Sequence, residues 1–450
     1  MSKRLSDSKL FRWGILFLVG FVLSVNYYFY DAFSSLKSLL TSELGFTNTH
    51  FGLFVSFYSI PNTFLFMAVI GGIVLDRLGI RRTGFMFVFF MAFGAMLTAY
   101  GASKMYQAGG LGYHFMTSFL PDYSPELKMM LLGRFFFGLG AETSIVVVSK
   151  IIVKWFKGKD LALAFGIKVG FGRLGTLLAL TLQPILTNEG TELNTAIWFA
   201  GILVTTGLLA FIVYMLFDLK FDKETEVDQK LITEKDKFKI TDVTSILTNR
   251  AYLYIALLCV TFYSAAFPFM AFAPDFFLNK FGVSMEVSGA IAALLPAATA
   301  IMTPFVGVFV DRIGKSATVM IYGSALLIIV HLTFALTSFP PYILMILLGV
   351  AFSLVPAAMW PTMVKLVKEK QIGTAYGLMY SIQNLGLWGF PILAGIILDA
   401  SNPGNPETLD YTNTILMFAG LGFLGLFFGY MLKRSDKKYG LGVDQPLNKK

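Results

Sequence analysis

Long apolar segments alternate with short polar ones along almost the whole chain. Each apolar segment is long enough for a spanning helix, which needs about 20 apolar residues to cross the hydrocarbon core. The centres of the segments lie near Leu23, Thr63, Phe90, Ala141, Gly172, Leu203, Phe262, Leu295, Ile329, Phe352, Gly386 and Gly422. The pattern predicts an all-α membrane protein with twelve transmembrane helices.

One polar stretch, residues 218–249, separates the sixth apolar segment from the seventh. It has no apolar run long enough to span a membrane, so we predict a cytosolic linker between two helical bundles. The predicted organisation is an N-terminal six-helix bundle (1–217), the linker, a C-terminal six-helix bundle (250–433) and a cytosolic tail (434–450). The residues before the first apolar segment are too few and too polar for a signal peptide. We therefore expect the first apolar segment to be a transmembrane helix.

The two bundles repeat each other in sequence. Pro61, Gly72, Asp76, Arg77 and Gly79 recur 235 residues later as Pro296, Gly307, Asp311, Arg312 and Gly314. Gly138, Ala164, Gly166, Gly175 and others recur 211 residues later, as Gly349, Ala375, Gly377 and Gly386. The long loop 104–127 of the first half accounts for the difference between the offsets. Parallel six-helix repeats predict two pseudo-symmetric halves and alternating access around a site near the midplane.

Composition agrees with a membrane protein and also orients it. Of the 450 residues, 56% are hydrophobic and 14% are charged, whereas soluble domains have roughly 25% charged residues. If both termini are cytoplasmic, 28 of the 36 Lys and Arg residues lie in inner segments and four in outer loops. Basic residues favour the cytoplasmic side. The net charge of +9 therefore reflects topology, and we expect the lipid bilayer, not nucleic acid, to surround this chain.

Two charged residues lie near the middle of neighbouring predicted helices. Glu142 and Arg173 fall at similar depth, where each charge costs roughly 2.5–3.5 kcal/mol on insertion scales. Their repeat counterparts, Ser353 and Asn384, are neutral. Glu142 could bind an ammonium group and Arg173 a carboxylate, which suits a zwitterionic small-molecule substrate. A structural Glu–Arg pair is the alternative, and the two interpretations are compatible.

Other polar residues are weaker candidates for the substrate site. Asp31 ends the first predicted helix and could gate, bind an ammonium group, titrate or be solvated. Lys150 and Lys168 are expected to extend toward the inner surface. The remaining candidates are Tyr58, Asn62, Tyr263, Trp360, Gln383 and Asn384. The three His residues are scattered, and no nucleophile lies in a pattern with a base, so we expect no metal, no cofactor and no enzymatic activity.

A glycine- and arginine-rich motif follows the second predicted helix. Gly72, Asp76, Arg77, Gly79, Arg81 and Arg82 have the spacing G-x-x-x-D-R-x-G-x-R-R. This resembles signature motif A of the major facilitator superfamily, and its partial copy is Gly307, Asp311 and Arg312. We expect Gly72 to allow close helix contact, and Asp76 to pair with an Arg or a helix N-terminus in a gate. Arg134 to Ala141 resembles motif B, with Phe137 in place of the usual Gln.

Three small residues lie close together on the fifth predicted helix. Gly170, Gly172 and Gly175 match a dinucleotide-binding spacing, but no strand precedes them. We therefore predict that they allow tight helix packing.

Several runs are similar to a narrower group, the animal lysosomal dipeptide transporters of this superfamily (the domain-containing protein 1 group). They are Tyr-Ser-Ile-Pro-Asn (58–62), Trp-Phe-Lys-Gly-Lys (155–159), Phe-Pro-Phe (267–269), Phe-Phe-Leu-Asn-Lys-Phe-Gly (276–282) and Gly-Thr-Ala-Tyr-Gly-Leu-Met-Tyr-Ser-Ile-Gln-Asn-Leu-Gly (373–386). The resemblance implies dipeptide uniport, with Glu142 and Arg173 engaging the peptide and a glycosylated accessory subunit.

Two departures from that group change the expected setting. The chain has no Asn-x-Ser/Thr sequon and no acidic dileucine signal. We therefore expect a prokaryotic cytoplasmic membrane, and these departures count against the accessory subunit. A transporter of another small organic ion, such as a carboxylate or amino acid, with or without proton coupling, is the alternative function.

Overall fold

The computed structural model consists of two compact units. One contains Met1–Gly45 and Phe57–Thr233, and the other contains Phe46–Ser56 and Glu234–Lys450. The structure describes residues 8–156, 160–187, 192–225, 240–368, 371–404 and 406–446. Residues 46–56, which the sequence assigns to the N-terminal bundle, therefore group with the second unit.

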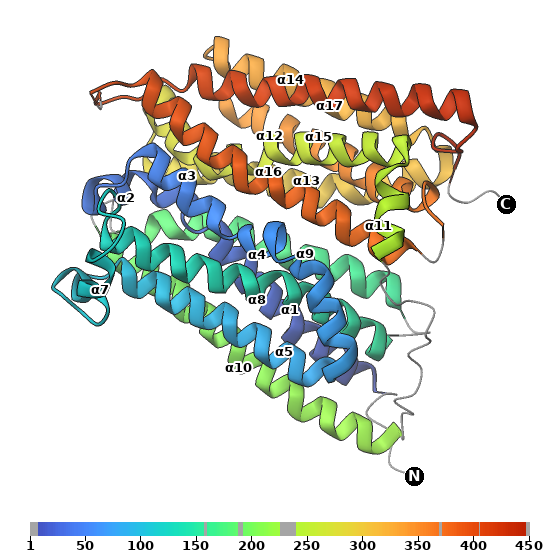
Figure 1. Ribbon diagram of the computed structural model, residues 1–450, viewed down its shortest axis with the longest axis horizontal. Coiled ribbons are helices and arrows are strands. Elements are labelled where there is room, and N and C mark those ends of the chain that lie inside the picture. The colour runs from blue at the N-terminus through green and yellow to red at the C-terminus, as the bar shows by residue number, and fades with distance from the viewer. Residues whose placement is uncertain are drawn as a thin grey trace. The chain divides into compact units, whose positions relative to one another are not determined.

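Helices are the only regular elements among the described residues (Figure 1). Unit 1 contains α1 (Lys9–Asp31), η2 (Ser34–Leu36), α2 (Lys37–Leu44), α4 (Ile60–Phe64), α5 (Met67–Gly101), α6 (Lys104–Gln107), α7 (Tyr113–Thr117), α8 (Pro125–Phe156), α9 (Leu161–Ile185) and α10 (Leu193–Thr225). Unit 2 contains α3 (Asn48–Phe57) up to Ser56, α11 (Ile240–Leu247), α12 (Arg250–Phe281), α13 (Met285–Ile313), α14 (Ser316–Leu336), α15 (Pro341–Lys365), α16 (Ile372–Ser401) and α17 (Thr412–Tyr439).

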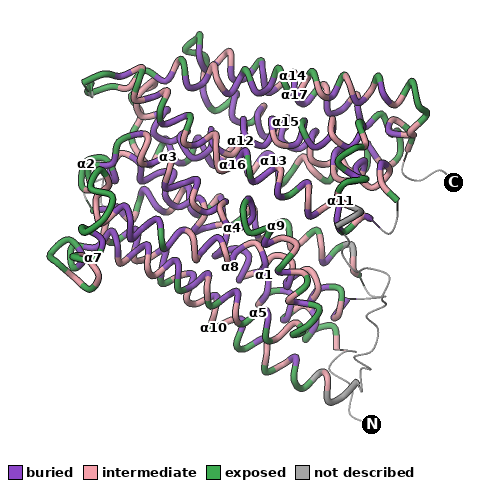
Figure 2. The backbone as a smooth tube through the Cα atoms, viewed as in Figure 1, coloured by how far each residue is buried: buried purple, intermediate pink, exposed green. Residues whose placement is uncertain are grey.

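Eleven of the described helical segments are long and apolar enough to cross a membrane. Helices satisfy their own backbone hydrogen bonds, which lipid cannot do. Exposed apolar side chains such as Phe85, Phe89 and Phe93 recur every four residues along α5. Figure 2 shows this alternation as green turns between purple ones on the long helices. An apolar surface of this kind suits contact with lipid.

The predicted second helix is interrupted, which the hydropathy pattern did not reveal. It comprises α3, α4 and the part of α5 before Gly79, where the backbone turns at φ 78°. One break lies at Tyr58 and Ser59, and a second lies at Phe66, whose backbone is left-handed (φ 52°). The third predicted helix is the remainder of α5.

The same helix pairs form in both units, as the sequence repeat predicts. In unit 1, α1 pairs with α9 and α10, and α5 pairs with α8 and α10. In unit 2, α12 pairs with α16 and α17, and α14 pairs with α15 and α17. The helix pairs correspond in chain order, which is consistent with parallel repeats.

The stretch predicted as a linker is partly helical. The last turns of α10 extend into it as far as Thr225, and α11 occupies 240–247. Residues 226–239 lie outside the described part of the chain. The helical extension matters because it carries Asp218 and Asp222.

Small residues allow the closest helix contacts. A Cβ added at Gly175 of α9 would lie 2.1 Å from the Ser24 carbonyl oxygen of α1. A Cβ added at its repeat counterpart, Gly386, would lie equally close to the Ser264 hydroxyl oxygen of α12. Gly172 packs on the Tyr27 ring, whereas no atom lies within 4 Å of a Cβ at Gly170. The packing prediction for this glycine motif is confirmed at Gly172 and Gly175.

We predict opposite results for two alanine substitutions on α9. Gly175→Ala should lower the unfolding temperature, because overpacking against backbone costs about 1–3 kcal/mol. Gly170→Ala should leave it unchanged or raise it slightly, since Ala favours helices more than Gly does. Thermal unfolding of the purified variants, followed by tryptophan fluorescence, measures both. Equal unfolding temperatures would contradict the packing described here.

Candidate functional site

Glu142 lies on α8 beside the first break in the interrupted helix. Tyr58, at that break, donates a hydrogen bond from its hydroxyl to Glu142 Oε1 at 2.6 Å. Asn62 of α4 lies near this carboxylate, but neither polar atom of its buried amide forms a hydrogen bond. A Cβ at Gly138 would lie 2.1 Å from the Tyr58 carbonyl oxygen, so this glycine lets the broken backbone approach α8. The break thus places one hydroxyl donor on Glu142 and an unbonded amide near it.

Asp31 is buried near the end of α1 and is only 5% exposed. Thr176 of α9 donates a hydrogen bond to Asp31 Oδ2 at 2.7 Å. The charges of Arg173 and Arg134 both act on this carboxylate. Burial excludes the possibility, left open by the sequence, that Asp31 is a solvated helix end.

Tyr27 of α1 lies near both carboxylates. Its hydroxyl lies within electrostatic range of Arg173, Glu142 and Asp31. Because Tyr27 precedes Asp31 by one helical turn, both side chains share a face of α1. Sequence analysis did not select Tyr27, although this four-residue spacing was a usable signal. Unit 1 therefore holds two acids and one arginine around a single tyrosine.

Hydrogen bonds between helices support this arrangement. Asn26 of α1 donates from Nδ2 to the Ala141 carbonyl, next to Glu142, at 3.2 Å. Ser24 donates from Oγ to the Phe171 carbonyl, two residues before Arg173, at 2.6 Å. α1 is thereby bonded to both helices that carry the charged candidates, which limits their movement relative to one another.

Arg134 is fully buried on α8. Its guanidinium carbon lies 5.4–6.0 Å from the ring centroids of Tyr30, Phe33, Tyr58 and Phe137. The Phe29 and Tyr30 carbonyls accept hydrogen bonds from it at 3.5 Å. Phe137, which replaces the usual motif B Gln, thus helps to form an aromatic enclosure around Arg134.

Unit 2 groups several of its own candidates into an aromatic cluster. Trp360 donates from Nε1 to the Tyr263 hydroxyl at 3.1 Å and stacks on Tyr380, with ring centroids 4.7 Å apart. Asn384 donates to the Tyr380 carbonyl at 3.0 Å, one turn back on α16. The Gln383 side chain instead accepts a weak contact from Cys259 Sγ at 3.8 Å. The cluster has no charged member among these residues, unlike the group in unit 1.

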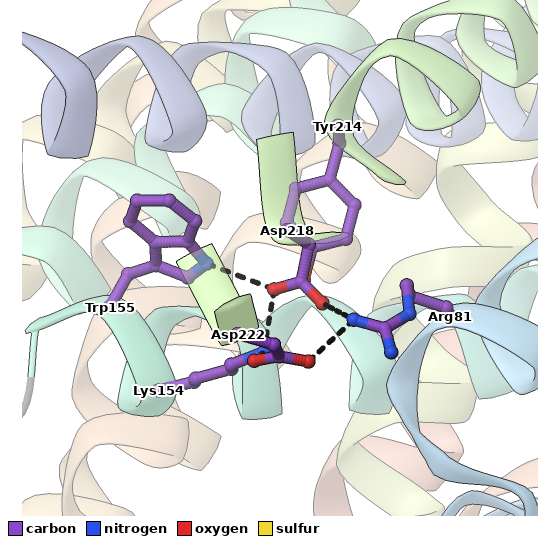
Figure 3. A network of polar contacts seen from close by, with 6 residues as sticks. All are labelled: Arg81, Lys154, Trp155, Tyr214, Asp218 and Asp222. Atoms are coloured by element: carbon purple, nitrogen blue, oxygen red, sulfur yellow. Dashed lines mark hydrogen bonds and ion pairs between the residues drawn. The ribbon is translucent and has the colours of Figure 1, made fainter. Parts of the chain in front are cut away.

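Motif A is joined to the end of α10 by an ion-pair network (Figure 3). Arg81 contacts Asp218 and Asp222 at 2.9 and 2.5 Å. Lys154 of α8 contacts the same two carboxylates at 2.8 and 2.6 Å. The fully buried Asp218 also accepts hydrogen bonds from Tyr214 and Trp155, at 2.9 and 3.3 Å. Shared carboxylates tie α5, α8 and α10 together at this end of unit 1.

Two expectations about motif A are wrong in detail. Asp76 pairs with Lys150 of α8 at 2.5 Å, not with an Arg or a helix N-terminus. Gly72 has no atom within 4 Å of an added Cβ, whereas one at Gly71 would meet Thr143 at 2.4 Å. Arg77 and Arg82 are exposed. Lys168 of α9 is half-buried and donates to Ser149 Oγ at 2.5 Å.

The second copy of the motif is covered by the end of the chain. Asp444 accepts a hydrogen bond at Oδ1 from the Ala317 N–H at 2.9 Å, which caps α14. Its carbonyl accepts from the Lys315 N–H at 2.8 Å. Gly314, with φ 74°, lies directly under this tail. Gly307 has open space around it, Asp311 is half-buried and Arg312 is exposed.

Among the described residues, no three His, Cys, Asp or Glu side chains are grouped in a way that could hold a metal ion. The polar groups described above include two carboxylates, Asp31 and Glu142, together with arginine and neutral side chains.

Comparison with known proteins shows the family. A family model described as Major Facilitator Superfamily matches residues 16–391 and 260–445. The human protein named lysosomal dipeptide transporter MFSD1 is 32% identical over 396 residues, covering 86% of this chain and 80% of that protein. Its counterpart from Danio rerio is 32% identical over 395 residues, with coverage of 86% and 80%.

Solved structures show the same fold at low sequence identity. A bacterial homologue of the human lysosomal transporter Spinster, in an inward-facing and occupied conformation, gives a TM-score of 0.70 at 14% identity. The alignment covers 96% of this chain and 99% of that one. A D-xylose–proton symporter also gives 0.70 at 14% identity, covering 94% and 97%.

The ion-pair network predicts a pH-dependent stability contribution from Asp222. Partial burial raises the pKa of this carboxyl, but hydrogen bonds and charge from Lys154 and Arg81 outweigh burial and lower the pKa below its usual value. The ionised carboxylate therefore stabilises the fold above about pH 4, and this contribution disappears as the pH falls through the lowered pKa. Asp222→Asn should unfold at a lower temperature than the unmodified protein at pH 7.

Measured unfolding temperatures of the two proteins should converge on acidification below about pH 4. Glu407→Gln, at an exposed carboxyl, is the control and should match the unmodified protein throughout. A difference between Asp222→Asn and the unmodified protein that stays constant with pH would contradict this account.

Proposed function

This chain belongs to the Major Facilitator Superfamily, and we propose that it carries dipeptides across the membrane by binding both charged ends of the peptide. As a member of the family it is a multi-pass membrane transporter of small molecules. The proposal concerns the substrate and the residues that bind it. The observation that carries it is the grouping of Glu142, Asp31 and Arg173 around Tyr27 within one unit.

The chemistry of this group suits a zwitterion. Glu142 accepts a hydrogen bond from the neutral hydroxyl of Tyr58 and has the Asn62 amide nearby, and an incoming ammonium group can replace or join these groups. Arg173 offers a planar guanidinium that can hold a carboxylate through two hydrogen bonds. A free dipeptide carries both groups, separated by its backbone.

The comparisons support a peptide substrate. Relatives named lysosomal dipeptide transporters are about one third identical to this chain over most of its length. Those names specify a dipeptide, and the acid Glu142 and the base Arg173 suit its ammonium and carboxylate ends. A small organic anion is the second candidate, because Arg134, Lys168 and Arg173 outnumber Asp31 and Glu142 in the same unit.

We further propose that the network at Arg81 and the pair Asp76–Lys150 act as an inner gate. These ion pairs join the motif A loop to α8 and α10, and α8 also carries Glu142. In the proposed orientation both termini are cytoplasmic, because basic residues favour that side. The proposed setting is a prokaryotic membrane, because the chain has no Asn-x-Ser/Thr sequon and no acidic dileucine signal. An accessory subunit is not part of this proposal.

Ligand-induced stabilisation tests the substrate class. A ligand that binds only the folded protein raises its unfolding temperature in proportion to occupancy. We expect stabilisation of the purified protein by dipeptides, and none by single amino acids, dicarboxylates or sugars at the same concentration. Stabilisation by dicarboxylates alone would refute the dipeptide proposal and support the organic-anion candidate.

Substitutions test the two charged residues. Glu142→Gln and Arg173→Lys should each weaken dipeptide binding by about 10- to 100-fold, because hydrogen bonds to charged groups contribute roughly 1.5–3 kcal/mol. Arg173→Lys keeps the charge but loses the two-pronged contact. Lys168→Gln on the same helix is the control and should bind normally. Isothermal titration measures all three, and unchanged affinity in either site variant contradicts the assignment.

A further inference from the structure

The connection between α5 and α8, residues 102–124, is a small packed segment with its own core. It contains α6, which packs on the end of α5, and α7, which packs on α8. The rings of Tyr100 and Tyr113 lie 5.1 and 5.4 Å from the buried Tyr106 ring. Figure 1 shows α7 at one end of the long helices of unit 1. The corresponding connection in unit 2, between α14 and α15, is much shorter (337–340).

Large apolar side chains are exposed on the outside of this α6–α7 segment. Phe115, Phe119 and Leu120, which we call the apolar patch, are 68%, 39% and 58% exposed. The ring centroids of Phe115 and Phe119 lie 5.5 Å apart, so the two rings form one surface. Figure 2 shows exposed turns in green around α7. Contiguous exposed apolar surface of this kind marks a place where an apolar partner binds.

Lys128 of α8 holds the apolar patch in place. Its Nζ donates hydrogen bonds to the Phe119 and Leu120 carbonyl oxygens, at 2.6 and 3.3 Å. The same Nζ lies 4.9 Å from the centroid of the Phe119 ring. Leu120 has a left-handed backbone (φ 46°), which a glycine would adopt without strain. In water, a leucine held in this conformation with its side chain exposed would have strain and no compensating contact, so an apolar surrounding suits it better.

The apolar patch continues the lipid-facing surface of α8. Leu132 is an exposed apolar residue of this membrane-spanning helix. Lys128 lies one helical turn before Leu132, so the two side chains share a face of α8. Phe119 covers Lys128 at the start of that face, and the apolar surface therefore runs from Leu132 onto the α6–α7 segment. Lipid that contacts Leu132 is thus in reach of the patch, and aromatic side chains are enriched at this level of a membrane.

We propose that the α6–α7 segment is an interfacial anchor whose apolar patch enters the boundary between phospholipid headgroups and acyl chains. Phe115, Phe119 and Leu120 contact the acyl chains, whereas exposed polar side chains of the same segment, such as Gln107 and Asp122, stay in water. The anchor binds through buried apolar area, as amphipathic surface helices do. Because the counterpart connection in unit 2 is so short, the anchor acts on unit 1 and holds it at a fixed depth. It is independent of which solute the protein carries.

An environment-sensitive fluorophore tests the anchor. Cys259 is the chain's single cysteine, so Cys259→Ser gives a background in which Phe115→Cys or Leu120→Cys is labelled with a nitrobenzoxadiazole maleimide. The labelled protein is reconstituted into phosphatidylcholine vesicles. Emission at both positions should be blue-shifted relative to the label in water. Phosphatidylcholine with a doxyl group near the top of its acyl chain should lower this emission more than aqueous iodide does, because the label lies among the acyl chains.

Two matched positions calibrate the measurement. Asp122→Cys, at an exposed carboxyl of the same segment, should report water, with iodide quenching its label more than doxyl lipid does. Leu132→Cys, on the lipid-facing side of α8, should be quenched by doxyl lipid and protected from iodide. Circular dichroism and unfolding temperature show whether each labelled variant is folded. If labelled Phe115→Cys is not folded, Leu120→Cys decides the outcome.

Two results overturn the anchor. One is that labels at Phe115→Cys and Leu120→Cys behave like the label at Asp122→Cys, which places the apolar patch in water. The other is a blue shift without quenching by doxyl lipid, which means that protein covers the patch. Loss of that blue shift when the protein is diluted with lipid in the vesicles would identify the covering protein as a second copy of this chain.

Discussion

The hydrocarbon interior of a membrane offers no hydrogen-bond partner, and the rest of this structure follows from that constraint. Regular helix satisfies most of the backbone internally. Where the helix is interrupted, at Tyr58 and again at Phe66, the chain lies against α8 or α5 in unit 1, with Gly138 making room for the first break. Charges obey the same constraint, since Asp31 is held by Thr176 and lies near two arginines. Irregular backbone and buried charge thus occur together, as in transporters generally.

α8 links the parts of unit 1 that the proposed function needs. It carries Glu142 near its middle and Lys150 and Lys154 toward its end, where they bind Asp76 and the carboxylates of α10. A ligand that shifts α8 by binding at Glu142 would therefore also change the geometry of the ion pairs of motif A.

The sequence predicted the fold better than it predicted the site. Hydropathy and the two repeat offsets indicated the helices and their parallel halves, and spacing identified the packing role of Gly175. Hydropathy could not reveal the break at Tyr58, because apolar residues continue through it. The Lys150 partner of Asp76 depends on how separate helices meet, and no local pattern encodes that, whereas the spacing of Tyr27 and Asp31 on one helix was a signal that sequence analysis missed. Glu142 and Arg173 were selected because a charge at that depth requires a partner or a ligand.

Counterflow exchange in proteoliposomes tests the central claim most directly. Vesicles containing the protein are loaded with unlabelled dipeptide, and uptake of the labelled dipeptide is followed with no ion gradient imposed. The account predicts that labelled dipeptide accumulates transiently and that free dipeptides compete. N-acetylated or C-amidated versions should not compete, because each lacks one of the two charges that Glu142 and Arg173 would bind. Equal competition by a blocked dipeptide, or exchange of carboxylates with none of the dipeptide, would contradict a site that holds both ends of the peptide.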